Sequence, residues 1–98
     1  MSDYRLTQRA AMDLEELFEY SIERFGLTRT ERYKAELGRC LDRIAFDPRI
    51  GWPVGGRTRP FFRYECLRHV VFFTLMPNGV LVIRILHGAM APERHLPD

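Results

Sequence analysis

A single glycine interrupts what is otherwise one long stretch of helical periodicity in the first half of the chain. Before and after Gly26, apolar side chains recur every third or fourth residue, as they do on one face of an α-helix. The pattern predicts a first helix over residues 8–25, with Thr7 as its N-cap and Gly26 just past its end. Its outer surface is acidic.

The second helix is predicted to begin at a capping-box pattern and to end before a proline. Thr28–Glu31 supplies the capping box, and Asp47-Pro48 disfavours helix beyond Phe46. Because the link between the helices is only about two or three residues, we expect them to be close to antiparallel.

The remaining elements are predicted to be strands. Tyr4 and Leu6 alternate with polar neighbours, which indicates a short strand ahead of the first helix. Residues 48–60, rich in Pro and Gly, are predicted to be a loop. Tight turns are expected at Leu67-Arg68 and at Asn78-Gly79, the latter of type I′. They separate three strands, over Phe61–Leu67, His69–Leu75 and Val80–His87.

Together these elements predict an α+β fold. An N-terminal strand, an antiparallel helical hairpin and a three-stranded antiparallel meander form one sheet packed on the helices. The last segment, Gly88–Asp98, is expected to be a short turn or tail over the sheet edge. With 98 residues, the chain is expected to be a single domain spanning 1–98.

Composition narrows the setting of the protein. No apolar run approaches the roughly 20 residues that span a bilayer, and the N-terminus has no apolar segment typical of a secretory signal. Two cysteines do not make a disulfide framework, and Cys40 lies on the apolar stripe of its helix, so it is expected in the core. We therefore expect a reduced, cytoplasmic protein with no membrane contact.

The basic residues are concentrated in the second half of the chain. Residues 1–48 carry a net charge of −2 and residues 49–98 a net charge of +4, and all the basic residues except Lys34 are arginines. This favours an anionic partner for the second half. An alternative is a general preference for Arg over Lys. Direct DNA binding is not expected, because the sequence shows no basic recognition helix.

Arg84 stands in the middle of the last, nearly continuous apolar strand. A buried Arg needs a carboxylate, several carbonyls or an open groove. One interpretation is an ion pair, with Glu65 as a candidate partner; the other is an anion-binding group in a cleft. Arg84 and His87 leave opposite faces of an ideal strand, so they share a site only if the strand bends or ends before His87.

Cofactor and catalytic motifs are sparse. Cys66-x-x-His69 lacks a second ligand pair, so neither a zinc site nor any other metal or cofactor is predicted. A metal-free nuclease would need a base, an acid and cations for the phosphate. The residues available for proton transfer are His87 and His95, and those available for charge are Arg57, Arg59, Arg63 and Arg84.

Several short motifs, taken in order, resemble the ParE branch of the ParE/RelE superfamily of bacterial toxins. They run from Tyr4-Arg5-Leu6-Thr7, Ala10, Asp13-Leu14 and Phe25-Gly26, through Tyr33, Leu37 and Asp47–Gly51, to His69–Phe73, Arg84–His87, Met90 and His95-Leu96. The resemblance covers essentially the whole chain. It implies the toxin of a type II toxin–antitoxin system that inhibits DNA gyrase without being an enzyme, and a hetero-oligomer with a ParD-like ribbon-helix-helix antitoxin.

Two alternatives stay open. RelE relatives cleave mRNA in the ribosome; for that activity the candidate catalytic residues would be Arg84, His87 and Arg63. The lysines and the C-terminal tyrosine of the RelE-type catalytic site are absent from this sequence, which favours the ParE-like interpretation. The third possibility is a weakly toxic protein that binds the antitoxin for operon autoregulation.

The resemblance and the charge pattern together suggest binding residues. We expect an acidic, amphipathic antitoxin segment to enter a groove between helices and sheet and to meet Arg57, Arg59, Arg63 and Arg84. Trp52 is a candidate gyrase contact, although packing of Trp52 on the core is the preferred interpretation. Otherwise the sequence does not indicate which residues would contact gyrase.

Overall fold

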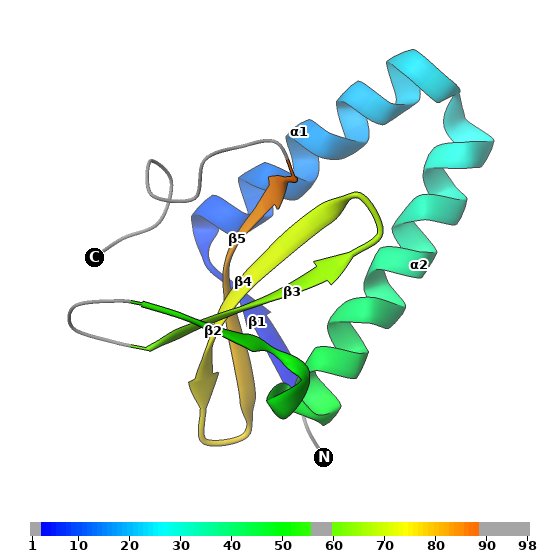
Figure 1. Ribbon diagram of the computed structural model, residues 1–98. Helices are drawn as coiled ribbons and strands as arrows, with labels where there is room; N and C mark the ends of the chain where they lie inside the picture. The colour runs from blue at the N-terminus through cyan, green and yellow to red at the C-terminus, as the bar shows by residue number, and fades with distance from the viewer. Residues whose placement is uncertain (1–2, 56–59, 89–98) are drawn as a thin grey trace.

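The computed structural model describes residues 3–55 and 60–88, and shows two helices lying over one face of a sheet (Figure 1). The elements in chain order are β1 (Asp3–Leu6), α1 (Gln8–Phe25), α2 (Leu27–Phe46), the 3-10 helix η1 (Pro48–Ile50), β2 (Trp52–Val54), β3 (Phe61–Cys66), β4 (His69–Met76) and β5 (Gly79–His87).

The sheet has five strands in the order β1-β5-β4-β3-β2. Strands β2 to β5 pair antiparallel with their neighbours along the chain, and β1 pairs in parallel with β5. The predicted α+β fold, with an N-terminal strand, two helices and a meander, is confirmed. β1 reaches the last strand of the sheet because the two helices carry the chain across one face before the meander begins.

The predicted loop over residues 48–60 contains more structure than expected. Its first part holds η1, capped by the Asp47 side chain, and then strand β2, which pairs with β3 through Trp52 opposite Arg63 and Val54 opposite Phe61. This strand is not predicted from the sequence because it contains Pro53, and proline is unfavourable at most positions of a strand. It is tolerated here because β2 is an edge strand.

Gly26 alone reverses the chain between the helices. Its φ of +85° is accessible to glycine at little cost, and it is both the C-cap of α1 and the N-cap of α2. The predicted capping box does not form, because α2 already begins at Leu27 and Thr28 lies inside it. Instead the Thr30 hydroxyl donates to the Gly26 carbonyl at 2.8 Å. The Thr7 N-cap of α1 is confirmed, accepting from the Ala10 amide at 3.0 Å.

The core lies on both faces of the sheet. The larger cluster, between sheet and helices, includes Leu37 and Ile44 from α2, Phe73 from β4 and Val82 from β5. A smaller cluster on the opposite face consists of Val70, Phe72 and Leu86, with Val54 packed against it. Strand β5 is therefore covered on both faces, as its nearly continuous apolar sequence predicts.

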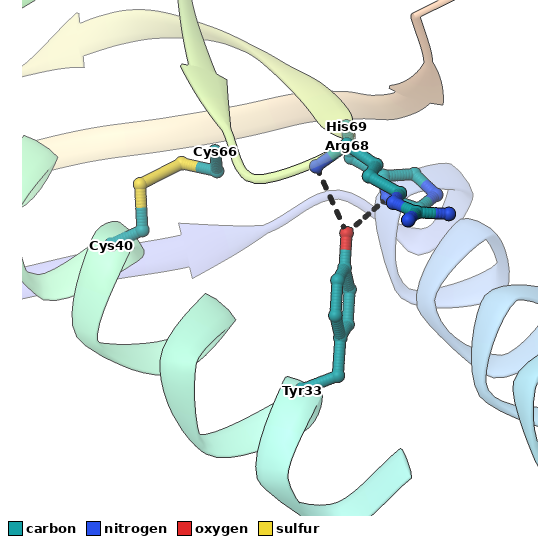
Figure 2. Close-up of a disulfide and its surroundings, with 5 residues drawn as sticks. All are labelled: Tyr33, Cys40, Cys66, Arg68 and His69. Atoms are coloured by element: carbon teal, nitrogen blue, oxygen red, sulfur yellow. Dashed lines mark hydrogen bonds between the residues drawn. A yellow bond between two sulfur atoms is a disulfide. The ribbon is translucent and has the colours of Figure 1, made fainter. Parts of the chain in front are cut away.

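A disulfide joins Cys40 of α2 to Cys66 at the end of β3, with their Cα atoms 6.0 Å apart (Figure 2). Cys40 is buried as expected, but not as a free thiol. Spacing along the chain gave no reason to pair two cysteines from a helix and a later strand. The fold places them together because β3 lies under α2.

Gly79 creates the room that β1 needs. The β4–β5 turn consists of Pro77 and Asn78, not of Asn78 and Gly79 as predicted, and Gly79 is the first residue of β5. A Cβ atom on Gly79 would lie 1.7 Å from the carbonyl oxygen of Asp3, and its φ is +154°. Only glycine therefore lets β1 pair at this position.

We predict that Gly79→Ala lowers the free energy of unfolding by about 2 kcal/mol or more, because it forces β1 away from β5. The matched substitution Gly38→Ala, inside α2, should instead raise it by roughly 0.5–1 kcal/mol. A Cβ atom at Gly38 meets nothing within 4 Å. Urea unfolding of both variants measures the difference, and equal effects of the two would contradict this account of β1.

Candidate functional site

A groove of about 950 Å³ is bounded by α1, the first half of α2, the β3–β4 turn and the end of β5. The helices diverge as a V from the turn that joins them, and the β3–β4 turn lies between the two arms and points toward that junction (Figure 1). Its apolar lining includes Leu17, Phe25 and Leu67. Its charged lining consists of five arginines and three carboxylates: Arg9, Arg24, Arg29, Arg68, Arg84, Asp13, Glu16 and Glu36. The groove is therefore amphipathic, with a surplus of positive charge.

Asp13 of α1 closes the open edge of the sheet at one side of this groove. β1 pairs with β5 only as far as Val82, and among the described residues no other strand pairs with the β5 edge beyond it. There one carboxylate oxygen of Asp13 accepts from the Ile85 amide at 3.0 Å, where a further strand would otherwise pair. The helix thus replaces the missing strand with a side chain.

The same carboxylate forms a bidentate ion pair with Arg84. The Arg84 Nε and Nη2 atoms donate to the two oxygens of Asp13 at 2.8 and 2.9 Å. The two side chains are only 7% and 8% exposed, so the attraction is little screened by water. Hydrogen bonding to Asp13 raises the pKa of the Arg84 guanidinium above its usual value, outweighing burial.

Arg84 therefore pairs with Asp13, and the proposed partner Glu65 is wrong. Glu65 belongs to β3 and lies 3.9 Å from Arg63 instead. The reason is the edge position of β5. Asp13 approaches that edge from α1, whereas β3 is separated from β5 by β4.

Tyr33 and two histidines meet at the other side of the groove. His69 and His87 are paired residues of β4 and β5, with ring centroids 5.7 Å apart. The Tyr33 hydroxyl lies 2.7 Å from His69 Nδ1 and accepts from the Arg68 amide at 3.3 Å. Burial, assisted by the charge of His87, lowers the pKa of His69 to about 4. His69 is therefore neutral at pH 7, and its Nδ1 can accept from Tyr33.

The β3–β4 turn carries local strain into the groove. Leu67 has a φ of +59°, in the left-handed region that bulky residues rarely adopt. Its side chain is nevertheless 48% exposed. A strained backbone that presents an exposed apolar side chain to a groove is characteristic of binding sites, because neither feature stabilises the fold.

The structure separates the residues singled out from the sequence. Arg84 and His87 both line the groove. Arg63 does not line it. Arg63 and Arg84 both pair with Phe72 of β4, on the face away from the larger core cluster, but only the Arg84 guanidinium reaches the β5 edge where Asp13 lies. Arg57, Arg59, Met90 and His95 lie outside the described residues. Catalytic use of Arg63 together with Arg84 and His87 would thus require groups that line two separate hollows.

Trp52 does not pack on the core. Its side chain is 74% exposed, on the edge strand β2. It borders a second, shallower hollow of about 440 Å³ with Ile50, Arg63 and Tyr64. The preferred interpretation of a core-packed Trp52 is therefore wrong, and this hollow shares no residue with the groove.

Sequence reasoning missed the arginines that line the groove. It assigned no role in the site to Arg9, Arg24, Arg29 or Arg68. A signal was available, because Arg9, Asp13, Glu16, Tyr20 and Arg24 follow the helical spacing of a single stripe. A stripe of mixed charge and aromatic character beside the apolar stripe indicates a second contact surface.

Metal binding finds no support in the described segments. Residues 3–55 and 60–88 bring together no three His, Cys, Asp or Glu side chains that could hold a metal ion. Cys66, which the Cys66-x-x-His69 spacing offered as a ligand, is bonded to Cys40.

Comparisons with known proteins place the chain in a family and match its fold. The family model described as ParE toxin of type II toxin–antitoxin system, parDE, matches residues 4–92. Toxin ParE1 of Caulobacter vibrioides is 34% identical over 96 residues, covering 98% of this chain and 99% of the relative. Toxin ParE1 of Mycobacterium tuberculosis H37Rv is 34% identical over 97 residues, covering 97% and 98%.

The chain therefore belongs to the ParE toxin family of type II toxin–antitoxin systems, and the predicted resemblance is confirmed. A solved structure of the chromosomal ParDE TA system from P. aeruginosa shares the fold, with a TM-score of 0.73 at 12% identity over 89% of this chain and 96% of that one. Neither described helix is long and apolar enough to cross a membrane.

We predict that Asp13→Asn lowers the free energy of unfolding by about 2–4 kcal/mol, because it removes the carboxylate charge that faces the buried Arg84 guanidinium. Glu16→Gln, an exposed groove carboxylate on the same helix, should stay within about 0.5 kcal/mol of the parent. In a double-mutant cycle with Arg84→Met, the two losses should overlap by roughly 1–3 kcal/mol. Strictly additive losses in urea unfolding would show that the pair is not coupled.

The titration of His69 predicts loss of stability in acid. The unfolded chain binds a proton on this residue near pH 6.5, whereas the folded protein does so only at about 4. The contribution of His69 to folding stability is therefore complete above pH 6.5 and is lost as the pH falls toward 4. Because the ring is partly exposed, the loss should be on the order of 1–2 kcal/mol. Urea unfolding of His69→Gln should show a flatter pH profile than the parent across this range; parallel profiles would refute the assignment.

Proposed function

We propose that this chain is a cytoplasmic, non-enzymatic toxin that inhibits DNA gyrase and is neutralised by a ParD-like antitoxin with a ribbon-helix-helix DNA-binding half. Membership of the ParE family over residues 4–92 is the observation that carries the proposal. Because ribbon-helix-helix halves dimerise, the complex is a hetero-oligomer.

The groove between the helices and the sheet is the docking site that we assign to the antitoxin. Its chemistry complements an acidic amphipathic helix: apolar residues for the inner stripe, and arginines for the flanking carboxylates. Arg9, Arg24, Arg29 and Arg68 are the cations available to a partner, since Arg84 is engaged with Asp13. Arg84 contributes by holding α1 against β5, which sets the floor of the groove.

Charge reversal in the groove tests this assignment. Arg24→Glu and Arg68→Glu should each weaken binding of the cognate antitoxin about tenfold or more, with a smaller effect in high salt. Arg39→Glu, on α2 but outside the groove, is the matched control and should change affinity less than about twofold. Isothermal titration on folded variants gives these constants. Unchanged affinity in both groove variants would place the antitoxin elsewhere.

The substitution Arg63→Glu tests whether the antitoxin also contacts the other face of the sheet. The sequence predicts such a contact, because it predicts Arg57, Arg59 and Arg63 as antitoxin-binding residues. Loss of affinity there together with the groove variants would describe a segment that wraps the edge of the sheet. Loss in Arg63→Glu alone would move the site to the opposite face.

We assign the gyrase contact to the surface around Trp52. An indole exposed on an edge strand next to an arginine is well suited to anchor a protein partner. Because this surface and the groove share no residue, the two partners would meet different residues. Any mutual exclusion would come from the bulk of the antitoxin.

Trp52→Ala should abolish gyrase inhibition while leaving antitoxin affinity within about twofold of the parent. Phe46→Ala removes another aromatic of high exposure, 82% against 74% for Trp52, and serves as the control. The measurement is gyrase supercoiling and cleavage-complex formation, run beside mRNA cleavage on programmed ribosomes. Codon-phased cuts with unaffected gyrase would establish the RelE-like activity instead. Antitoxin binding with neither activity would leave a role in autoregulation.

A further inference from the structure

Two attachments hold the β3–β4 turn against α2. Cys66, the last residue of β3, is bonded to Cys40, and the Arg68 amide and His69 ring, across the turn, are bonded to the Tyr33 hydroxyl (Figure 2). Tyr33 and Cys40 are about two helical turns apart and so share one face of α2. One attachment is covalent, and the other consists of hydrogen bonds.

These attachments position one wall of the groove. Leu67, Arg68 and His69 line the groove from the turn, and Tyr33 lines it from α2. The strained conformation of Leu67 gives the turn a reason to rearrange when it is released. The distance between this wall and the helix therefore depends on both attachments.

The bridge is closed to reagents while the turn stays in place. Cys40 and Cys66 are only 6% and 1% exposed. A thiolate must reach one of the sulfur atoms to reduce the bond, so the turn has to move away from α2 first. The Tyr33 hydrogen bonds oppose that movement.

A buried disulfide in a protein that acts in the cytoplasm is unusual. In that reducing compartment disulfides are mostly transient and respond to redox conditions. This step rests on the cytoplasmic toxin proposed above. A bond that joins a helix to the wall of the binding groove is placed where its opening would alter binding.

We propose that Cys40–Cys66 is a reversible thiol–disulfide modification site, reduced by dithiols, whose state sets how firmly the β3–β4 turn is held as a wall of the groove. One thiolate of the dithiol attacks a sulfur of the bridge and forms a mixed disulfide. The second thiolate displaces it. Two electrons and two protons pass to Cys40 and Cys66, and the dithiol becomes a disulfide. Glutathione disulfide reverses the change.

Binding in the groove is then coupled to the redox state. In the oxidised form the β3–β4 turn is already held in place before the antitoxin binds. Binding therefore loses less conformational entropy, and the oxidised form binds the antitoxin more tightly. By linkage, a bound antitoxin must favour the oxidised form to the same extent. An occupied groove also blocks the turn from moving, which slows reduction.

The first test uses the full chain without antitoxin. Reduction by dithiothreitol is followed by alkylation and mass spectrometry in the parent, Tyr33→Phe and Tyr20→Phe. Tyr33→Phe should be reduced at least about fivefold faster, because the second attachment is gone. Tyr20→Phe, another groove tyrosine without those hydrogen bonds, should stay within about twofold. Equal rates in the three proteins, or cysteines that stay free thiols in glutathione disulfide, would overturn the proposal.

Hydrogen exchange of the parent decides the case even if Tyr33→Phe does not fold. Reduction should speed exchange of the Arg68 amide about tenfold or more, while amides of Ile44 and Val82 in the core keep their protection. Loss of protection throughout the chain would mean that the disulfide only stabilises the fold as a whole. The proposed role of the disulfide in holding the β3–β4 turn would then be wrong.

The cognate antitoxin separates this inference from the proposed function. We expect the oxidised chain to bind several-fold more tightly, and bound antitoxin to slow reduction about tenfold. Equal affinity for both forms would remove the coupling and leave the antitoxin site intact. No binding to either form, with the turn still loosened by reduction, would instead contradict the proposed function and leave the redox site standing.

Discussion

The carboxylate of Asp13 holds the two halves of this protein together. It closes the edge of β5 where β1 ends, by accepting from the Ile85 amide, and it neutralises Arg84 with two further hydrogen bonds. This pairing offsets much of the cost of burying a cation in the strand, since desolvation of a guanidinium costs several kcal/mol (of the order of 5). Together with the apolar contacts of Ala10 and Leu14 in the core, this group fixes the position of α1 relative to the sheet, and with it the floor of the groove.

The elements could be read from the sequence because they rest on local chemistry. Thr7, Gly26 and Pro48 mark the helix ends, and the apolar run Val80–Leu86 marks a strand covered on both faces. Pairings between distant segments could not be read in this way. Asp13 and Arg84 are 71 residues apart, and Cys40 and Cys66 are joined only because β3 lies under α2. Both residues of the ion pair stood in the motifs that indicated the family, but a motif does not say which of its members touch.

The candidate site shows the same division. The sequence pointed to arginines in the second half of the chain, yet Arg9, Arg24 and Arg29 of the groove come from the first half, whose net charge is negative. Net charge over half a chain is a poor guide here, because folding sorts side chains by face. Trp52 illustrates the reverse case: a lone tryptophan is usually buried, and only the pairing of β2 at the sheet edge explains its exposure.

The parallel pairing of β1 with β5 also determines at what point of synthesis the sheet and the groove can form. The first strand has no partner until Gly79–Val82 has been made, and the edge beyond it is closed by Asp13 only when Arg84 and Ile85 follow. Contacts of such long sequence separation form late, because the intervening chain must first be closed into a loop. Until β5 has been synthesised, the nascent chain therefore contains the two helices but not the strand with which β1 pairs. The groove is complete only once His87 has left the ribosome, so a partner that recognises the groove can act only after β5 has been made.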